Sequence, residues 1–361
     1  MSAEQPFSAP VSDPVDGQHL LDVRELSVRF ASDDGPVQAV DDVSFRLGHG
    51  EIVALVGESG CGKSVTAMAV LGLLPSSADV TGSIEFAGRE LTGLAKRTMS
   101  DIRGRDIAMV FQEPMTSLNP VLTVGRQIGE VLRRHEGLSR KASRERAREL
   151  LELVGIPAPE RRVREYPHQL SGGMRQRVMI AMAVACDPKV LVADEPTTAL
   201  DVTIQAGVLD VFRDLRDRLG TSIIVITHDL GVVADLADRV VVMYAGQRVE
   251  QADVDDLFEE PQHPYTLGLL GAVPNPDDAD EHGPGRRLSE IPGKVPVLSQ
   301  PADTCVFSPR CPRATQECVS QVPPLDELRP RHWAACFHPG ADPEAGGRRG
   351  GDARTIREDT A

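Results

Sequence analysis

The chain has 361 residues, a formal net charge of −15 and 41% hydrophobic residues. This length allows one large domain with a smaller one, and the ordinary apolar content predicts a packed core. The acidic balance argues against nucleic acid as a partner. We find no run of about 18 apolar residues and no basic, apolar N-terminal signal, so we expect a cytosolic protein without structural disulfides among its six cysteines.

The first elements are read from periodicity in chain order. Residues 1–19 are rich in Ser, Pro and Asp and are expected to form a flexible leader. Alternating residues predict half-buried strands over 21–30 and 39–47. The apolar run at 51–57 ends in glycine, as a buried parallel strand does, and helical spacing follows over 62–74. This half of the chain therefore begins with strands and then a strand–loop–helix unit.

Further along the chain the same alternation continues. Residues 139–155 predict an amphipathic helix that ends at a glycine, and 189–196 and 222–229 predict two more buried strands. Strands that alternate with helices imply an α/β fold with a parallel sheet. The composition changes near residue 260, where we expect a domain boundary, and residues 341–361 are expected to form a flexible tail.

A phosphate-binding loop is predicted at "GESGCGKS", which fits the pattern G-x-x-x-x-G-K-[ST] between a strand and a helix. Its backbone N–H groups and the helix N-terminus would bind phosphates, while the lysine neutralises the β- and γ-phosphates and the serine ligates Mg²⁺. The candidate nucleotide-binding residues are Gly57, Glu58, Ser59, Gly60, Cys61, Gly62, Lys63 and Ser64.

An acidic strand end, "VLVADE", is the second half of this predicted site. Asp194 would hold Mg²⁺ through water, and Glu195 would polarise the water that attacks the γ-phosphate. A strand that ends in two acidic residues is weak alone and strong beside the glycine loop. The two motifs together predict a nucleoside triphosphatase.

"LSGGMRQR" at 170–177 lies between these motifs, and in this order they resemble the ATP-binding subunits of ABC transporters, over about residues 20–338. In that family the signature faces the nucleotide of a second ATPase subunit. The resemblance implies that Ser171, Gly172 and Gly173 contact the partner's γ-phosphate. Met174 stands where many members have Gln.

Other residues match further family elements. Gln112 matches the Q-loop, which senses Mg²⁺ or the attacking water, and His228 matches the switch histidine that contacts the γ-phosphate. Asp201 matches the D-loop, and Phe30 is the candidate that stacks on adenine. The resemblance therefore implies three catalytic residues, Glu195, His228 and Gln112, and a Mg²⁺ site that involves Ser64, Gln112 and Asp194.

The fold that the resemblance implies is an ABC-type P-loop ATPase domain over 20–260, with a RecA-like parallel sheet core and an antiparallel β subdomain. A helical signature subdomain would lie at about 114–185. "FQEPMTSLNP", "HPYT" and the cysteine segment look like the ATPases of dipeptide, oligopeptide and related nickel importers. Residues 261–340 would then be a small C-terminal extension that carries four cysteines.

Such importers combine two membrane permeases, a second, non-identical ATPase subunit and an external solute-binding protein. The resemblance therefore implies a peripheral subunit on the cytoplasmic face of the membrane that hydrolyses ATP to drive peptide import. Nickel or another small solute is the alternative cargo. A soluble ABC ATPase of repair or translation is disfavoured, because the chain has one cassette and no long heptads. An exporter is disfavoured by "HPYT" and the extension.

The extension holds Cys305, Cys311, Cys318 and Cys336 with the spacing C-x₅-C-x₆-C-x₁₇-C. Four thiolates suit zinc or an iron–sulfur cluster, and zinc knuckles of the C-x₂₋₄-C type are absent. Some peptide-importer ATPases hold a [4Fe–4S] cluster here, so we favour iron–sulfur over zinc and over metal-free thiols. Cys61 and a sixth cysteine, at 186 in a predicted Ala-rich helix, are interpreted as buried fillers.

Overall fold

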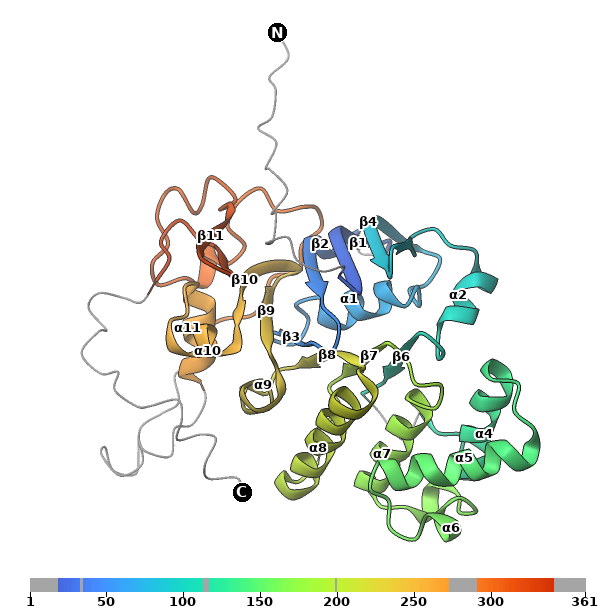
Figure 1. The fold of residues 1–361 in the computed structure, drawn as a ribbon. Coiled ribbons are helices and arrows are strands. Elements are labelled where there is room, and N and C mark those ends of the chain that lie inside the picture. Colours follow the sequence, from blue (N-terminus) through green and yellow to red (C-terminus); the bar gives the residue numbers. More distant parts are fainter. Residues whose placement is uncertain (1–18, 33–34, 113–116, 199, 273–290, 341–361) are drawn as a thin grey trace, which may run out of the picture.

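The computed structural model describes residues 19–32, 35–112, 117–198, 200–272 and 291–340. The predicted leader, apart from His19, and the predicted tail lie outside these ranges. Of the motifs quoted above, residues 113–116 of "FQEPMTSLNP" and residue 199 of "TALD" also lie outside them. The described part is built on two sheets, with helices on both sides of the larger one (Figure 1).

The smaller sheet is antiparallel and has the order β2–β1–β4–β5. Alternating burial along its strands places one face on the core, as the sequence periodicity predicted. Its strands are β1 (Leu21–Phe30), β2 (Val37–Leu47), β4 (Ala78–Phe86) and β5 (Arg89–Glu90).

The larger sheet has the order β11–β12–β10–β9–β3–β8–β7–β6. Its central strands β9, β3, β8, β7 and β6 are parallel, and the first four of these are buried along their whole length because both faces are covered. The strands are β3 (Ile52–Val56), β6 (Ile107–Val110), β7 (Val190–Asp194), β8 (Ser222–Thr227), β9 (Arg239–Tyr244), β10 (Gln247–Asp253), β11 (Leu325–Arg329) and β12 (His332–Ala335).

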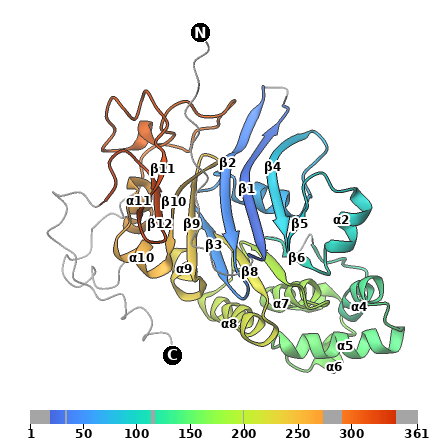
Figure 2. The ribbon, with the colours of Figure 1, turned by 45° about the horizontal axis from the view of Figure 1, so that its top comes forward.

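Helices lie at the β6 edge of this sheet and at the opposite edge, near β10 and β11 (Figures 1 and 2). Several of their N-termini carry polar caps: Ser139, Ser171 and Asp201 each accept a backbone N–H of the first turn. The helices are α1 (Lys63–Val70), α2 (Lys96–Ile102), α4 (Val124–His135), α5 (Arg140–Leu153), α6 (Pro159–Arg162), α7 (Gly172–Ala183), α8 (Val202–Leu219), α9 (Leu230–Leu236), α10 (Val254–Glu259) and α11 (Pro264–Gly271), with the 3₁₀ turns η1 (Pro167–Gln169) and η2 (Ser308–Arg310).

The C-terminal extension continues the main sheet, a feature that the sequence pattern did not predict. Strand β12 pairs antiparallel with β10, and β11 pairs with β12. Val306 and Phe307 of the cysteine segment are buried in a core shared with β9, β10 and α11. The division near residue 260 stays a prediction, and strand pairing joins the segments on its two sides.

Buried polar contacts explain the "HPYT" segment, where α11 begins. Burial lowers the pKa of His263 to about 4, so its neutral Nδ1 accepts the N–H of Tyr265 at 3.0 Å and caps the helix. The fully buried Glu250 carboxylate accepts the backbone N–H groups of Gln262 and His263 at 2.6 and 2.9 Å. His332 Nε2 of β12 lies 2.7 Å from the same carboxylate, so β10, α11 and β12 are fixed together.

Candidate functional site

The glycine loop runs from the end of β3 into α1, as the sequence predicted. A Cβ on Gly57 would lie 2.2 Å from the Met243 carbonyl oxygen, and one on Gly62 would lie 2.5 Å from that of Ala39. Both glycines have positive φ, 148° and 100°. Side chains at these positions would clash with backbone and strain it, so the tight loop requires glycine there.

Lys63 is the first residue of α1 and is only 6% exposed. Its Nζ donates to the carbonyl oxygens of Gly57 at 2.7 Å and Glu58 at 3.0 Å, so the ammonium group lies inside the loop. Cys61 is buried beside it, with its Sγ 3.7 Å from Nζ, as a small filler would be. A buried cation enclosed by a glycine loop is an anion-binding arrangement.

Ser64 and Asp194 come together at the adjacent strand end. Ser64 Oγ donates to Asp194 Oδ1 at 3.0 Å. Burial raises the pKa of Asp194, and the charge of Glu195 adds to this, whereas Ser64 and Lys63 lower it. A hydroxyl and a carboxylate that face one another beside a lysine are oxygen donors suited to Mg²⁺. Gln112, the third predicted Mg²⁺ residue, contacts Glu195 instead.

Three side chains hold the Glu195 carboxylate. Gln112 Nε2 and Thr198 Oγ1 donate to Oε2 at 2.7 and 2.9 Å, and His228 Nδ1 lies 3.1 Å from Oε1. Burial opposes ionisation, yet the contacts with Thr198 and His228 and the charge of Lys63 lower the pKa of Glu195 overall. The three residues predicted from the sequence to be catalytic therefore lie together, with Gln112 and His228 in contact with the Glu195 carboxylate.

Thr198 was missed by the sequence analysis, although it lies only three residues after Glu195. Glu195 has φ 45°, a conformation that is uncommon outside glycine, and its N–H donates to the Ile226 carbonyl oxygen at 2.9 Å. This bend turns the chain back, so that the hydroxyl of residue 198 reaches the carboxylate. A hydroxyl at this spacing after a strand-ending acid is the signal that could have found it.

The remaining predicted residues lie elsewhere. Ser171 caps α7 by accepting the N–H of Met174 at 3.3 Å, and Asp201 caps α8 by accepting that of Ile204 at 3.0 Å. Ser171 and Gly172 are exposed, and within the described ranges no hydrogen bond or ion pair joins Ser171–Gly173 to the glycine loop. Phe30 ends β1, half-buried against the core under the smaller sheet.

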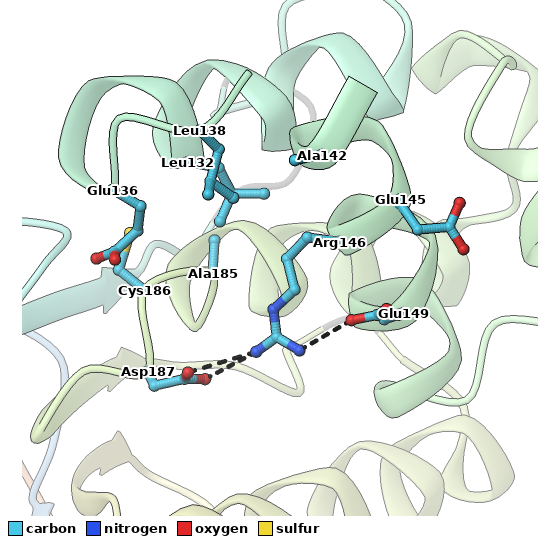
Figure 3. Close-up of a pocket in the computed structure, with 10 residues that line it drawn as sticks. All are labelled: Leu132, Glu136, Leu138, Ala142, Glu145, Arg146, Glu149, Ala185, Cys186 and Asp187. Atoms are coloured by element: carbon cyan, nitrogen blue, oxygen red, sulfur yellow. Dashed lines mark hydrogen bonds and ion pairs between the residues drawn. The ribbon is translucent and has the colours of Figure 1, made fainter. Parts of the chain in front are cut away.

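A cavity of about 440 Å³ lies away from these residues, between α4, α5 and the turn after α7 (Figure 3). Arg146 crosses it and pairs with Glu149 and Asp187, each at 3.2 Å. The charge of Arg146 is therefore already paired within the cavity. Cys186 lines it and is half-buried, after the end of α7 at Ala183 rather than within the helix, which corrects the sequence interpretation of a buried helical filler.

The four cysteines of the extension lie around η2 as free thiols. The Cys305 N–H donates to the Cys318 carbonyl oxygen at 3.0 Å. Burial chiefly, and the neighbouring thiols Cys311, Cys305 and Cys318, raise the pKa of Cys336 to about 11. Across the described ranges, no three His, Cys, Asp or Glu side chains are arranged to hold a metal ion. The geometry therefore does not support the iron–sulfur cluster expected at Cys305, Cys311, Cys318 and Cys336.

Comparison with known proteins decides the family. A family model described as "ABC transporter" matches residues 40–198, and one described as "Oligopeptide/dipeptide transporter, C-terminal region" matches 249–318. Over 320 residues the chain is 53% identical to a probable peptide ABC transporter ATP-binding protein, y4tR, of Sinorhizobium fredii, covering 88% of this chain and 94% of that one. The chain belongs to the ABC transporter ATP-binding proteins.

Other members and solved structures agree with this assignment. The oligopeptide transport ATP-binding protein OppD of Bacillus subtilis is 50% identical over 326 residues, which cover 89% of this chain and 90% of that one. The ABC cassette MJ0796, solved as a dimer bound to ADP and Pi, superposes with a TM-score of 0.59 at 27% identity, covering 65% of this chain and 98% of that one. The ABC fold and ATPase activity predicted from the motifs are thus confirmed.

ABC transporter ATP-binding proteins act with membrane permeases, so a permease partner follows from family membership. In the described ranges, no helix is both long and apolar enough to cross a bilayer. ATP and Mg²⁺ are the ligands of this ATPase family, and the loop around Lys63 and the Ser64–Asp194 pair offer donors for both.

Proposed function

We propose that this chain is the ATPase subunit that energises import of dipeptides or oligopeptides across the cytoplasmic membrane. The observation that carries this proposal is the match of residues 249–318 to the C-terminal region of oligopeptide and dipeptide transporters. Relatives named as peptide or oligopeptide transport proteins, 50–53% identical over nearly the whole chain, support it. Nickel or another small solute is the alternative cargo.

The nucleotide site of this proposal joins the two strand ends. The N–H groups of Gly57–Ser64 and Lys63 bind the phosphates, and Ser64 and Asp194 hold Mg²⁺, with Gln112 as the third proposed Mg²⁺ residue. Mg²⁺, when bound, neutralises charge that develops between the β- and γ-phosphates. Phe30 stacks on adenine. The buried lysine inside the loop and the Ser64–Asp194 pair support these assignments.

Glu195 is the proposed general base. Its carboxylate accepts a proton from water as that water attacks the γ-phosphate, while Gln112 and His228 orient the carboxylate and the transferring phosphate. The lowered pKa keeps this group ionised at neutral pH. A base that is ionised and held by three donors is ready for this step without reorganisation.

Each ATP lies between two subunits in the proposed cycle. Ser171, Gly172 and Gly173 at the exposed start of α7 contact the γ-phosphate bound by a second, non-identical ATPase subunit, and Asp201 crosses the same interface. Closure of the dimer moves two permeases, which receive solute from an external binding protein. The chain would lie peripherally on the cytoplasmic face, with 20–260 as the ATPase domain and 261–340 as the extension.

The import proposal is tested by reconstituting the chain with its permeases, partner ATPase and binding protein in liposomes. We expect uptake of labelled dipeptide or oligopeptide only with MgATP on the side of this chain. Nickel uptake without peptide uptake would select the alternative cargo. If neither solute nor permease changed the rate of ATP turnover, that result would contradict an import function.

Removing the Thr198 hydroxyl should change the pH dependence of turnover. This donor helps to lower the pKa of Glu195, so Thr198→Val is expected to raise that pKa. The base would then be protonated at a higher pH, and turnover would begin to fall at a higher pH as the solution is acidified. Rates from about pH 3.5 to 8 at saturating MgATP measure this, since the lowered pKa of Glu195 places the acid limb below its ordinary range, and Thr221→Val is the control. An unmoved acid limb would contradict the assigned role.

The cysteine segment carries a separate proposal. We propose that Cys305, Cys311, Cys318 and Cys336 bind a metal centre, with a [4Fe–4S] cluster favoured over zinc. The support is four free thiols in one half-buried segment, a donor set that suits both metals. The side-chain arrangement described above counts against it.

Metal analysis after anaerobic purification tests the cysteine proposal. Iron and acid-labile sulfide in about a 4:4 ratio per chain would support the cluster. About one zinc per chain would select the alternative. Cys311→Ser should lower the metal content, whereas Cys186→Ser should not. No metal in the wild-type chain would refute the proposal and leave the thiols as folding residues.

A further inference from the structure

A salt bridge joins the cysteine segment to the phosphate-binding loop. Arg310 lies in η2, immediately before Cys311, and its side chain is only 5% exposed. Its Nη1 donates to Glu58 Oε2 at 2.6 Å and its Nη2 donates to Oε1 at 3.0 Å. This is a two-point contact between a guanidinium and a carboxylate, the geometry that fixes both position and orientation.

The arginine is itself held rigidly. Its Nε donates to the Pro292 carbonyl oxygen at 2.7 Å, and its Nη2 also donates to that of Ile291 at 3.0 Å. The guanidinium carbon lies 5.7 Å from the centre of the Tyr244 ring at the end of β9. These contacts fix the guanidinium on the β9 side of the loop, so Glu58 must turn toward it.

Tyr265 of the "HPYT" segment holds the backbone of the same residue. Its hydroxyl oxygen accepts the N–H of Glu58 at 2.7 Å. The Tyr265 ring packs against Tyr244 and Phe307, with ring centres 4.7 and 5.5 Å apart. All three rings are fully or almost fully buried. The extension therefore reaches Glu58 by two routes, one to its side chain and one to its backbone.

Besides its carboxylate and its N–H, the carbonyl oxygen of Glu58 is also held, because it accepts from Lys63. When the lysine neutralises bound phosphates, Arg310 and Tyr265 remain to hold the residue. An unpaired Glu58 carboxylate would disfavour ATP binding, because a negative charge in a phosphate-binding loop repels ATP. The bidentate contact pairs this charge with the Arg310 guanidinium.

We propose that Arg310 is a positioning residue for nucleotide binding, which pairs the Glu58 carboxylate and fixes the first turn of the phosphate-binding loop. The extension thereby contributes directly to ATP affinity. This inference rests on the proposed nucleotide site, and it involves no contact between Arg310 and ATP. It requires that removing the guanidinium weakens ATP binding chiefly because the carboxylate is left unpaired.

The requirement is tested by a double-mutant cycle on the full chain, with MgATP affinity measured by calorimetry. Arg310→Met is expected to weaken binding about tenfold, because the charged partner of a half-buried carboxylate is lost. Glu58→Gln alone should change the affinity by less than about threefold, and the double variant should bind like Glu58→Gln. In the assembled transporter, Arg310→Met should raise KM for ATP and leave kcat near wild type.

Two controls separate the possible causes. Arg313→Met removes a neighbouring arginine that bonds to the Gly340 carbonyl oxygen and not to the loop, and it should bind MgATP normally. Arg310→Lys keeps the charge and should recover most of the affinity. If Arg310→Met does not fold, as judged by its melting curve, Arg310→Gln, which also removes the charge, completes the same cycle with and without Glu58→Gln.

The outcomes are distinct. Wild-type affinity in Arg310→Met overturns the inference, as does a double variant that binds as weakly as Arg310→Met, because the arginine would then act only through folding. Lys63→Ala serves as the reference for the site itself. If Lys63→Ala also binds like wild type, the proposed nucleotide site fails instead.

Discussion

Glu195→Gln is expected to lower ATP turnover by about 10²- to 10⁴-fold, the usual contribution of a general base. The amide can still accept from Thr198 and Gln112 but cannot take a proton from the attacking water. Because Lys63, Ser64 and the loop N–H groups are unchanged, MgATP should bind with wild-type affinity. Phosphate release by the reconstituted transporter and equilibrium nucleotide binding measure the two quantities separately.

The matched control is Glu149→Gln, which makes the same change on the exposed face of α5, where the carboxylate pairs with Arg146. Its turnover should equal that of wild type. Turnover close to wild type in Glu195→Gln would refute the role of this carboxylate. A parallel loss of binding and turnover would instead assign it to Mg²⁺ or nucleotide binding.

Lys63→Ala is expected to weaken MgATP binding by about 100-fold, since one residue supplies charge-assisted hydrogen bonds to two phosphate groups. The variant also removes the contacts with the Gly57 and Glu58 carbonyl oxygens. Because these two contacts within the chain are lost as well, some loss of thermal stability should accompany the loss of affinity. Calorimetric titration and melting curves with and without MgATP measure both effects.

Lys141→Ala is the control for this second variant, because Lys141 is exposed near the start of α5. Addition of MgATP should raise the melting temperature of wild type and Lys141→Ala and leave that of Lys63→Ala unchanged, since stabilisation by a ligand follows its affinity. An equal rise in all three proteins would show that ATP binds elsewhere.

Much of the site was predictable because its residues lie at ends of elements that the local sequence specifies. The short apolar runs before Gly57 and Asp194 are typical of buried strands, and parallel strands bring their carboxyl ends to one edge. Ser64 and Asp194 are 130 positions apart and still meet at 3.0 Å for this reason. The same geometry brings Gln112 and His228 to Glu195.

Long-range contacts that carry no local pattern were not predictable. Thr198 contacts Glu195 because the backbone bends at Glu195, which has positive φ. Hydrophobic periodicity does not predict such a bend. The cysteine spacing of the extension indicated a metal site, whereas the described side chains lie in no metal-ligating arrangement. Spacing along the chain cannot give the direction in which thiols point, because that direction depends on tertiary packing, and Val306 and Phe307 beside the first cysteine pack in the core with β9 and β10.

The strand–loop–helix units, the glycine loop, the acidic strand end and the family resemblance could all be predicted from the amino-acid sequence, because each depends on residues close together in the chain. The pairing of β12 with β10 and the contacts of Tyr265 and Arg310 with Glu58 became visible only in the folded chain. Arg310 and Glu58 are 252 positions apart, and their pairing depends on how the extension packs on β9 and α11. A contact of this kind is set by the summed packing of many side chains, which no short segment encodes.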